Sequence, residues 1–299
     1  MQRFYEHWAT LPGNIKGSLI ILLTSLIAVV MGSFIKHVGQ SIPVVEILFI
    51  RQILVLIIIL PVIVKNFDSV FTTTVMRFHF LRGFLSISAM FAAFTAIVYL
   101  PLAEVTAISF MRIVFTTILA IVFLKEIVGI RRWISVIIGF IGVLIIARPD
   151  TEGLNIYAVY AMVSACLVSG ISIVMRKLSQ VENPSTIMAY QSLIVTLGMA
   201  GPAIYLWVPP TYDEAILILI IGGLMSLMQW LYIQAFKVGE AAAIAPTEYS
   251  RLIFAIIIGF IFFAEIPTLW TLSGSGIIIA STLYTMHRER LKKSLPETI

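Results

Sequence analysis

The segment SFMRIVFTTILAIVFLKE, residues 109–126, returns 139 residues later as EYSRLIFAIIIGFIFFAE, residues 248–265. Without a gap, Arg112 aligns with Arg251. An arginine in such an apolar stretch is costly, because a charge at mid-membrane depth opposes insertion by about 2.5–3.5 kcal/mol even on a lenient scale. Two arginines at equivalent places therefore indicate an internal repeat and locate a candidate substrate site.

The composition is that of an integral membrane protein. Of 299 residues, 60% are hydrophobic and 12% are charged, and the mean hydropathy is +1.04. Apolar runs of about 20 residues, long enough to cross the roughly 30 Å hydrocarbon core as helices, recur along the chain. They predict an all-α membrane protein with ten transmembrane helices, at 17–35, 44–64, 78–99, 103–123, 132–148, 155–175, 186–207, 214–235, 241–263 and 268–286.

Basic residues fall mainly in alternate connections between these spans. With the N-terminus in the cytoplasm, fifteen lysines and arginines lie on the inner side, whereas the outer connections hold only Lys36 and Arg148. This bias and the even number of spans predict that both termini are cytoplasmic. Membrane potential and anionic headgroups also explain the formal charge of +5, so we expect no nucleic-acid partner.

The sequence offers little for enzyme chemistry. Cys166 is the only cysteine, so neither an intrachain disulfide nor a cysteine metal site can form, and the four histidines lie at ends and loops. No GxxxxGK[ST] loop, HExxH helix or GxSxG elbow occurs. We therefore expect no enzyme, no metal and no cofactor, and any transport must draw on a gradient or a partner.

The matched segments are the fourth and ninth predicted spans, so the repeating unit has five helices. Because five is odd, the second half is inverted relative to the first. Gly83 also aligns with Gly222. Inverted repeats are typical of secondary transporters, whose substrate sites lie near the bilayer midplane between the halves. We expect a first repeat at 1–150 (helices 1–5) and a second at 151–299 (helices 6–10 with a cytoplasmic tail).

Residues 100–150, LPLAEVTAISFMRIVFTTILAIVFLKEIVGIRRWISVIIGFIGVLIIARPD, resemble the EamA half-domain of the drug/metabolite transporter superfamily, and residues 235–281 repeat the pattern. The likeness extends over nearly the whole chain. It implies a ten-helix, multi-pass secondary transporter of small organic solutes in the bacterial inner (cell) membrane. Within the superfamily the chain looks most like the group containing S-adenosylmethionine uptake carriers, with metabolite exporters and riboflavin carriers more distant.

Arg112 and Arg251 lie about nine and ten residues into their spans, roughly 13–15 Å from each entrance at 1.5 Å per residue. A guanidinium presents a fixed fork of donors that suits a carboxylate, so the two form a candidate anion clamp. The alternative is an internal ion pair, since Glu248 precedes Arg251 by three residues on the same helix face. Both can hold if a substrate carboxylate displaces Glu248, whose protonation would then couple transport to a proton gradient.

Other candidate substrate-binding residues surround this pair. Tyr249, Trp230 and Gln229, with Tyr232 nearby, could stack on or hydrogen-bond to an organic substrate. Aromatic residues in membrane helices also serve as packing or interface anchors. Arg51, deep in the second span, is expected to face the interior and completes the candidate set.

Helix ends and small residues carry structural expectations. Glu126 and Glu265 end their spans on opposite membrane sides, as gates or as helix-end anchors, and we favour anchors. Small residues that allow close helix packing or a homodimer line the fifth and tenth spans: Ser135, Gly139, Gly142, Ser273, Gly274 and Gly276.

These features predict an alternating-access carrier of a small, carboxylate-bearing metabolite similar to S-adenosylmethionine, with the substrate, the lipid bilayer and a coupling proton as partners. An exporter of amino acids or drug-like metabolites would use the same architecture in the opposite direction. A non-transporting membrane receptor or assembly subunit, a different class, would use the charges as structural pairs.

Overall fold

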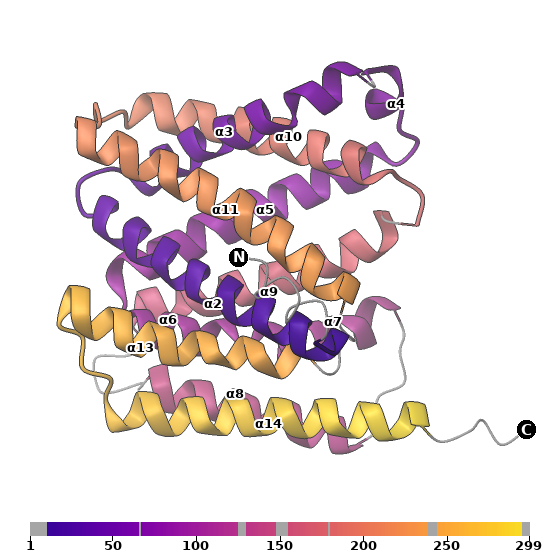
Figure 1. The fold of residues 1–299 in the computed structure, drawn as a ribbon, viewed down its shortest axis with the longest axis vertical. Coiled ribbons are helices and arrows are strands. Elements are labelled where there is room, and N and C mark those ends of the chain that lie inside the picture. The colour runs from indigo at the N-terminus through magenta and orange to yellow at the C-terminus, as the bar shows by residue number, and fades with distance from the viewer. Residues whose placement is uncertain are drawn as a thin grey trace, which may run out of the picture.

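The computed structural model describes residues 11–65, 67–124, 130–147, 155–178, 180–238 and 244–294. Every regular element in those ranges is a helix (Figure 1). In chain order these are α2 (Gly13–Val38), α3 (Val44–Lys65), α4 (Phe67–Phe71), α5 (Met76–Tyr99), α6 (Leu102–Ser109), α7 (Arg112–Leu124), α8 (Ile130–Ala147), α9 (Ile156–Leu178), α10 (Pro184–Tyr205), α11 (Tyr212–Val238), the 3₁₀ helix η1 (Ala245–Tyr249), α13 (Ser250–Phe263) and α14 (Leu269–Ser294).

Within the described residues, seven segments are long and apolar enough to cross a membrane: α2, α3, α5, the pair α6–α7, α9, α10 and α11. The remaining three predicted spans correspond to α8, to η1 with α13, and to α14. The ten-span fold predicted from the sequence is thus confirmed, with two spans, the fourth and the ninth, each divided into two helical pieces.

The helices lie side by side with their axes roughly parallel across Figure 1. The helices α3 and α10 lie at one end of the long axis, and α8 and α14 lie at the other. The pair α6–α7 runs from left to right in this view, whereas α13 runs from right to left. The equivalent segments of the two halves are therefore antiparallel, as an inverted five-helix repeat requires.

The packing of two equivalent glycines, one in each half, also follows the repeat. A Cβ at Gly83 of α5 would lie 2.4 Å from the Ile194 side chain of α10, and a Cβ at Gly222 of α11 would lie 2.7 Å from Leu54 of α3. Each glycine thus lets a helix of one repeat approach the second helix of the other repeat. Helices in a membrane associate through such close contacts, because burial away from lipid gives little driving force.

Small residues also join α8 to α14. A Cβ at Gly274 would lie 2.5 Å from the carbonyl oxygen of Gly142, and a Cβ at Gly142 would lie 2.9 Å from the carbonyl oxygen of Gly274. These two glycines therefore serve packing within one chain. Around Gly276 there is nothing within 4 Å of a Cβ, and the expected homodimer stays a prediction.

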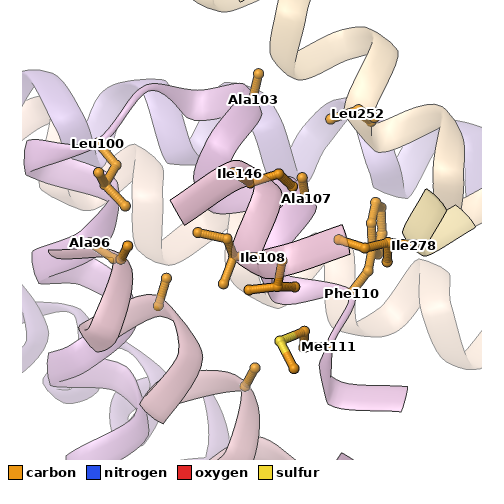
Figure 2. Close-up of a cluster of buried hydrophobic side chains, with 14 of the residues drawn as sticks. Ala96, Leu100, Ala103, Ala107, Ile108, Phe110, Met111, Ile146, Leu252 and Ile278 are labelled. Carbon is orange, nitrogen blue, oxygen red and sulfur yellow. The ribbon is translucent and has the colours of Figure 1, made fainter. Parts of the chain in front are cut away.

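A buried apolar cluster surrounds α6, with contributions from both repeats (Figure 2). Phe110 and Met111, at the end of α6, are 2% and 0% exposed in this cluster and lie near Ile146 of α8 and Ile278 of α14. The packing fixes the point at which the fourth span changes from α6 to α7.

Arg82 forms a buried contact between the two repeats. It lies within α5, is 8% exposed, and donates a hydrogen bond from Nη1 to the carbonyl oxygen of Ile187 (3.2 Å) in α10. A guanidinium supplies donors that satisfy a buried carbonyl, so Arg82 joins the two repeats.

Candidate substrate site

The fourth span breaks immediately before its arginine. The amide of Ile113 donates to the carbonyl of Phe110 (3.1 Å), three residues back, and regular α-helical bonding resumes with Phe115 donating to Met111 (2.9 Å). Arg112 is consequently the first residue of α7, midway along the 22-residue span Leu102–Phe123. A short 3₁₀ stretch within a helix often marks a functional hinge.

The ninth span breaks at the equivalent place. The 3₁₀ helix η1 ends at Tyr249, and α13 begins at Ser250 with Arg251 as its second residue. An offset of 139 residues relates Tyr249 to Phe110 and Ser250 to Met111. Both repeats therefore place an arginine in the first turn of the helical piece that follows the break, where the positive end of the helix dipole favours an anion.

The two breaks touch each other. The rings of Phe110 and Tyr249 lie 4.9 Å apart between centroids, at 67° to one another. These residues occupy equivalent positions in the two repeats. A pseudo-twofold axis relating the repeats would therefore pass through their edge-to-face contact. Aromatic pairs in this geometry stabilise a contact by about 0.5–1.5 kcal/mol beyond the area they bury.

A network of charges lies beside that contact. Nη2 of Arg112 donates to Oε2 of Glu248 in a close ion pair, and the hydroxyl of Tyr232 donates to Oε1 of the same carboxylate (2.7 Å). Arg251 interacts electrostatically with Arg112, Glu248 and Tyr232. We call these four residues the arginine cluster. Two guanidiniums and one carboxylate leave it with a net positive charge.

The ion pair differs from the intrahelical alternative considered from the sequence. Glu248 forms its ion pair with Arg112 of the other repeat; it lies in η1, whereas Arg251 lies in the helix that follows, α13. The side chains of Arg112 and Glu248 keep exposures of 35% and 19%. Ionisable groups at this depth of a membrane protein face the bundle interior or a water-filled space.

Two hydroxyl groups hold the start of α7 and were not recognised from the sequence. The carbonyl oxygen of Arg112 accepts hydrogen bonds from Thr116 Oγ1 (2.6 Å), one turn later, and from Ser169 Oγ (2.7 Å) of α9. Serine and threonine often bond the carbonyl groups of membrane helices, so no sequence signal distinguishes these two from the chain's other hydroxyl residues.

Arg51 lies apart from the arginine cluster. It is 2% exposed in α3, and its Nη2 contacts Gln52 Oε1 (3.2 Å) and Met90 Sδ (3.0 Å), with the ring of Phe94 5.5 Å away. These neighbours belong to α3 and α5 rather than to α7 or α13. No carboxylate among the described residues forms an ion pair with Arg51, so it stays a separate substrate-binding prediction.

Some of the other predicted substrate-binding residues lie at the arginine cluster, and others do not. Tyr249 lies in the contact between the repeats, and Tyr232 joins the arginine cluster. Trp230 lies two residues earlier in α11 and is 56% exposed, which suits a lipid-facing ring as well as a substrate wall. The side chain of Gln229 and the residue Glu126 fall outside the part of the chain that the structure describes.

An all-helical membrane protein with two equivalent halves and a charged cluster between them has the architecture of a secondary transporter. The model of the EamA-like transporter family matches residues 15–148 and again residues 155–286. The chain belongs to the EamA-like transporter family, with one copy of the domain in each half. It is a multi-pass membrane transporter rather than an enzyme.

Individual relatives transport different molecules. The chain is 30% identical over 264 residues to the S-adenosylmethionine uptake transporter of Rickettsia bellii, covering 88% of this chain and 90% of that protein. It is 28% identical to the riboflavin transporter of Brucella anthropi (83% and 90% covered) and 26% identical to the pseudopaline exporter CntI of Pseudomonas aeruginosa (89% and 94% covered).

A solved crystal structure shares the fold. It superimposes with a TM-score of 0.61, covering 93% of this chain and 98% of that chain, at 13% sequence identity. At this identity the likeness supports the arrangement of helices alone.

Proposed function

We propose that this protein is a secondary carrier that takes up a small, carboxylate-bearing metabolite of the S-adenosylmethionine type by alternating access. The observation that carries the proposal is the meeting of two broken helices, each with an arginine in the first turn of its half-helix. In other secondary transporters, discontinuous helices aim such positive ends at anionic substrate groups near the midplane.

The arginine cluster suits a substrate with one negatively charged group. Arg112 and Arg251 bring two guanidiniums to one place, while Glu248 neutralises only one of them. A substrate carboxylate can accept paired hydrogen bonds from a guanidinium and so replace Glu248 as the partner of Arg112. The guanidinium of Arg112 and the substrate carboxylate each need a partner of opposite charge, since an isolated charge in an apolar interior is strongly disfavoured.

Displacement of Glu248 also gives a route for proton coupling. A carboxylate that loses its arginine partner in an apolar surrounding is stabilised by taking up a proton. Tyr232 donates to the same carboxylate and can keep it oriented during the exchange. We infer that each transported carboxylate is accompanied by one proton bound at Glu248.

The relatives guide substrate and direction. The 30% identity to an S-adenosylmethionine uptake transporter over most of both chains favours uptake of a related molecule. The likeness to the pseudopaline exporter favours the second candidate function, export of an amino-acid-like or drug-like metabolite through the same site. The proposed location is the bacterial inner membrane, with both termini in the cytoplasm.

The test is uptake of labelled S-adenosylmethionine, with carboxylate metabolites as competitors, into proteoliposomes containing the wild type, Arg112→Gln or Arg251→Gln. Losing one partner of a buried charge pair costs about 2–5 kcal/mol, so we expect each variant to lose affinity more than tenfold. Arg77→Gln is the matched control, because this exposed arginine at the start of α5 stacks near Phe78, away from the cluster.

Saturable uptake that is lost in both cluster variants and kept in Arg77→Gln supports the proposal. Saturable export in place of uptake would favour the second candidate. Folded arginine variants with wild-type flux would contradict the assignment of the cluster as the substrate site.

A further inference from the structure

A second ion pair joins the two repeats at one membrane face. Nζ of Lys36, in the last turn of α2, lies 2.5 Å from Oε1 of Glu265, directly after α13. The same Nζ donates to the carbonyl oxygen of Leu100 (2.6 Å), and Oε2 of Glu265 accepts from the amide of Leu102 (2.8 Å). We call these four residues the outer clasp, since the positive-inside prediction places this face outside.

The clasp is held by the backbone around it. Ala264 has a φ of 52°, a left-handed conformation that ends α13 and turns the chain toward Glu265. A Cβ at Gly259 would lie 2.7 Å from Oε2 of Glu265, so the absence of a side chain there makes room for the carboxylate. Lys36 also lies 5.4 Å from the ring of Phe263.

The position of the clasp connects it to the arginine cluster. Leu102 begins α6, which leads to the break before Arg112, and Glu265 follows α13, which begins at the break with Arg251. At 1.5 Å per residue, α6 is about 12 Å long and α13 is about 21 Å long. The clasp therefore ties together the outer ends of the two half-helices whose inner ends carry the proposed substrate site.

The charged side chains of the outer clasp are also less exposed than those of the ion pair in the arginine cluster. Side-chain exposures are 12% for Lys36 and 15% for Glu265, whereas Arg112 keeps 35%. Separating the start of α6 from the end of α13 must break the bond from the Leu102 amide to Glu265. Lys36 must then release either Glu265 or the Leu100 carbonyl. When it releases Glu265, the two charges are rehydrated at the membrane surface, so the pair can be broken and remade without leaving a charge in the apolar interior.

Another contact between the repeats behaves differently. Ser41, between α2 and α3, bonds Glu214 in the first turn of α11 at the outer face. Thr73 Oγ1, after α4, bonds Glu182 Oε1 (2.5 Å), before α10, at the opposite face. These two bonds hold the repeats together at both membrane faces in the same conformation, so this part of the molecule suits a fixed scaffold. A gate must open at one face alone. The outer clasp lies at one face only, so it can serve as such a gate.

We propose that Lys36 and Glu265 form the outer gate of the carrier, which holds α6 and α13 together until the outer face opens. The inference rests on the proposed transport function. It assigns to Glu265 a gating role in place of the simple helix-end anchor favoured from the sequence, because the anchor alone does not require a cationic partner from the other repeat.

The test measures access to a reporter cysteine and needs no substrate. In a Cys166→Ala background, Ser109→Cys places a thiol at the end of α6, between the clasp and the break. Right-side-out vesicles are treated with a membrane-impermeant thiol reagent. We expect Lys36→Met and Glu265→Gln to speed outer labelling about tenfold or more, since losing the pair favours the open population. Ser41→Ala, which removes the outer-face bond to Glu214 of α11, is the matched control and should label at the unaltered rate.

The double variant Lys36→Met/Glu265→Gln guards against misfolding, because it leaves neither charge buried without its partner. A folded double variant that labels as slowly as the Ser109→Cys parent would overturn the gate. Rapid labelling in Ser41→Ala as well would also overturn it, because the effect would not be specific to the clasp. Faster labelling in a protein without saturable flux would instead contradict the proposed transport function.

Discussion

At the scale of single residues, the mid-membrane Arg112 is tolerated because it is paired with a carboxylate. Arg112 has a carboxylate partner from the other repeat, and its carbonyl accepts two hydroxyl bonds. Arg251 shares that carboxylate's field from the first turn of α13. Among these described residues, two guanidiniums and one carboxylate leave a net positive charge.

Glu248 gives a prediction at this scale. Glu248→Gln keeps the size of the side chain and removes its titratable group, so uptake should lose its dependence on the proton gradient while substrate binding survives. The measurement is flux against external pH in proteoliposomes, together with equilibrium binding. Tyr232→Phe is the control, because it removes the 2.7 Å hydrogen bond and keeps the carboxylate, so it should retain the pH dependence. An unchanged pH profile in Glu248→Gln would sink the coupling hypothesis.

At the scale of elements, the contact between the two broken spans differs in kind from the contact between α8 and α14. The breaks bring two half-helix starts together through Phe110 and Tyr249, whereas α8 and α14 pack through backbone atoms at Gly142 and Gly274. Close backbone approach of this kind leaves no room for a methyl group, so the second contact is rigid.

That rigidity is testable by one pair of substitutions. Gly274→Ala adds a methyl group 2.5 Å from the Gly142 carbonyl oxygen, so α8 and α14 must separate, at a cost of about 1–3 kcal/mol. Gly276→Ala, two residues along the same helix, meets nothing within 4 Å and should be neutral or slightly stabilising. Thermal unfolding in detergent compares the two variants. Equal melting temperatures would show that the α8–α14 contact is not close in solution.

At the scale of the whole molecule, the inverted repeat brings equivalent residues from opposite directions to one place. Gly83 and Gly222 pack in equivalent ways, and the half-helices α7 and α13 are antiparallel. Two similar halves with opposite orientations can exchange conformations, and this exchange is the physical basis of alternating access.

Orientation in the membrane is the prediction that belongs to this scale. A fluorescent protein fused after residue 299 should fold and fluoresce in the cytoplasm, because the basic connections mark that side. Alkaline phosphatase inserted within residues 206–211, between α10 and α11, should be active outside. The reverse pattern would invert the topology and move the Lys36–Glu265 clasp to the inner face.

The sequence by itself determined the ten spans, the repeat and the two arginines, because membrane insertion depends on local hydrophobicity and a buried charge stands out against it. The likeness to the EamA half-domain added the family. Only the tertiary structure decided the partners: Glu248 forms its ion pair with Arg112 of the other repeat, Phe110 contacts Tyr249, Arg51 lies apart, and Lys36 pairs with Glu265. Such pairings depend on where the helices break and how the halves approach, and distances between residues far apart in the chain are not encoded in local patterns.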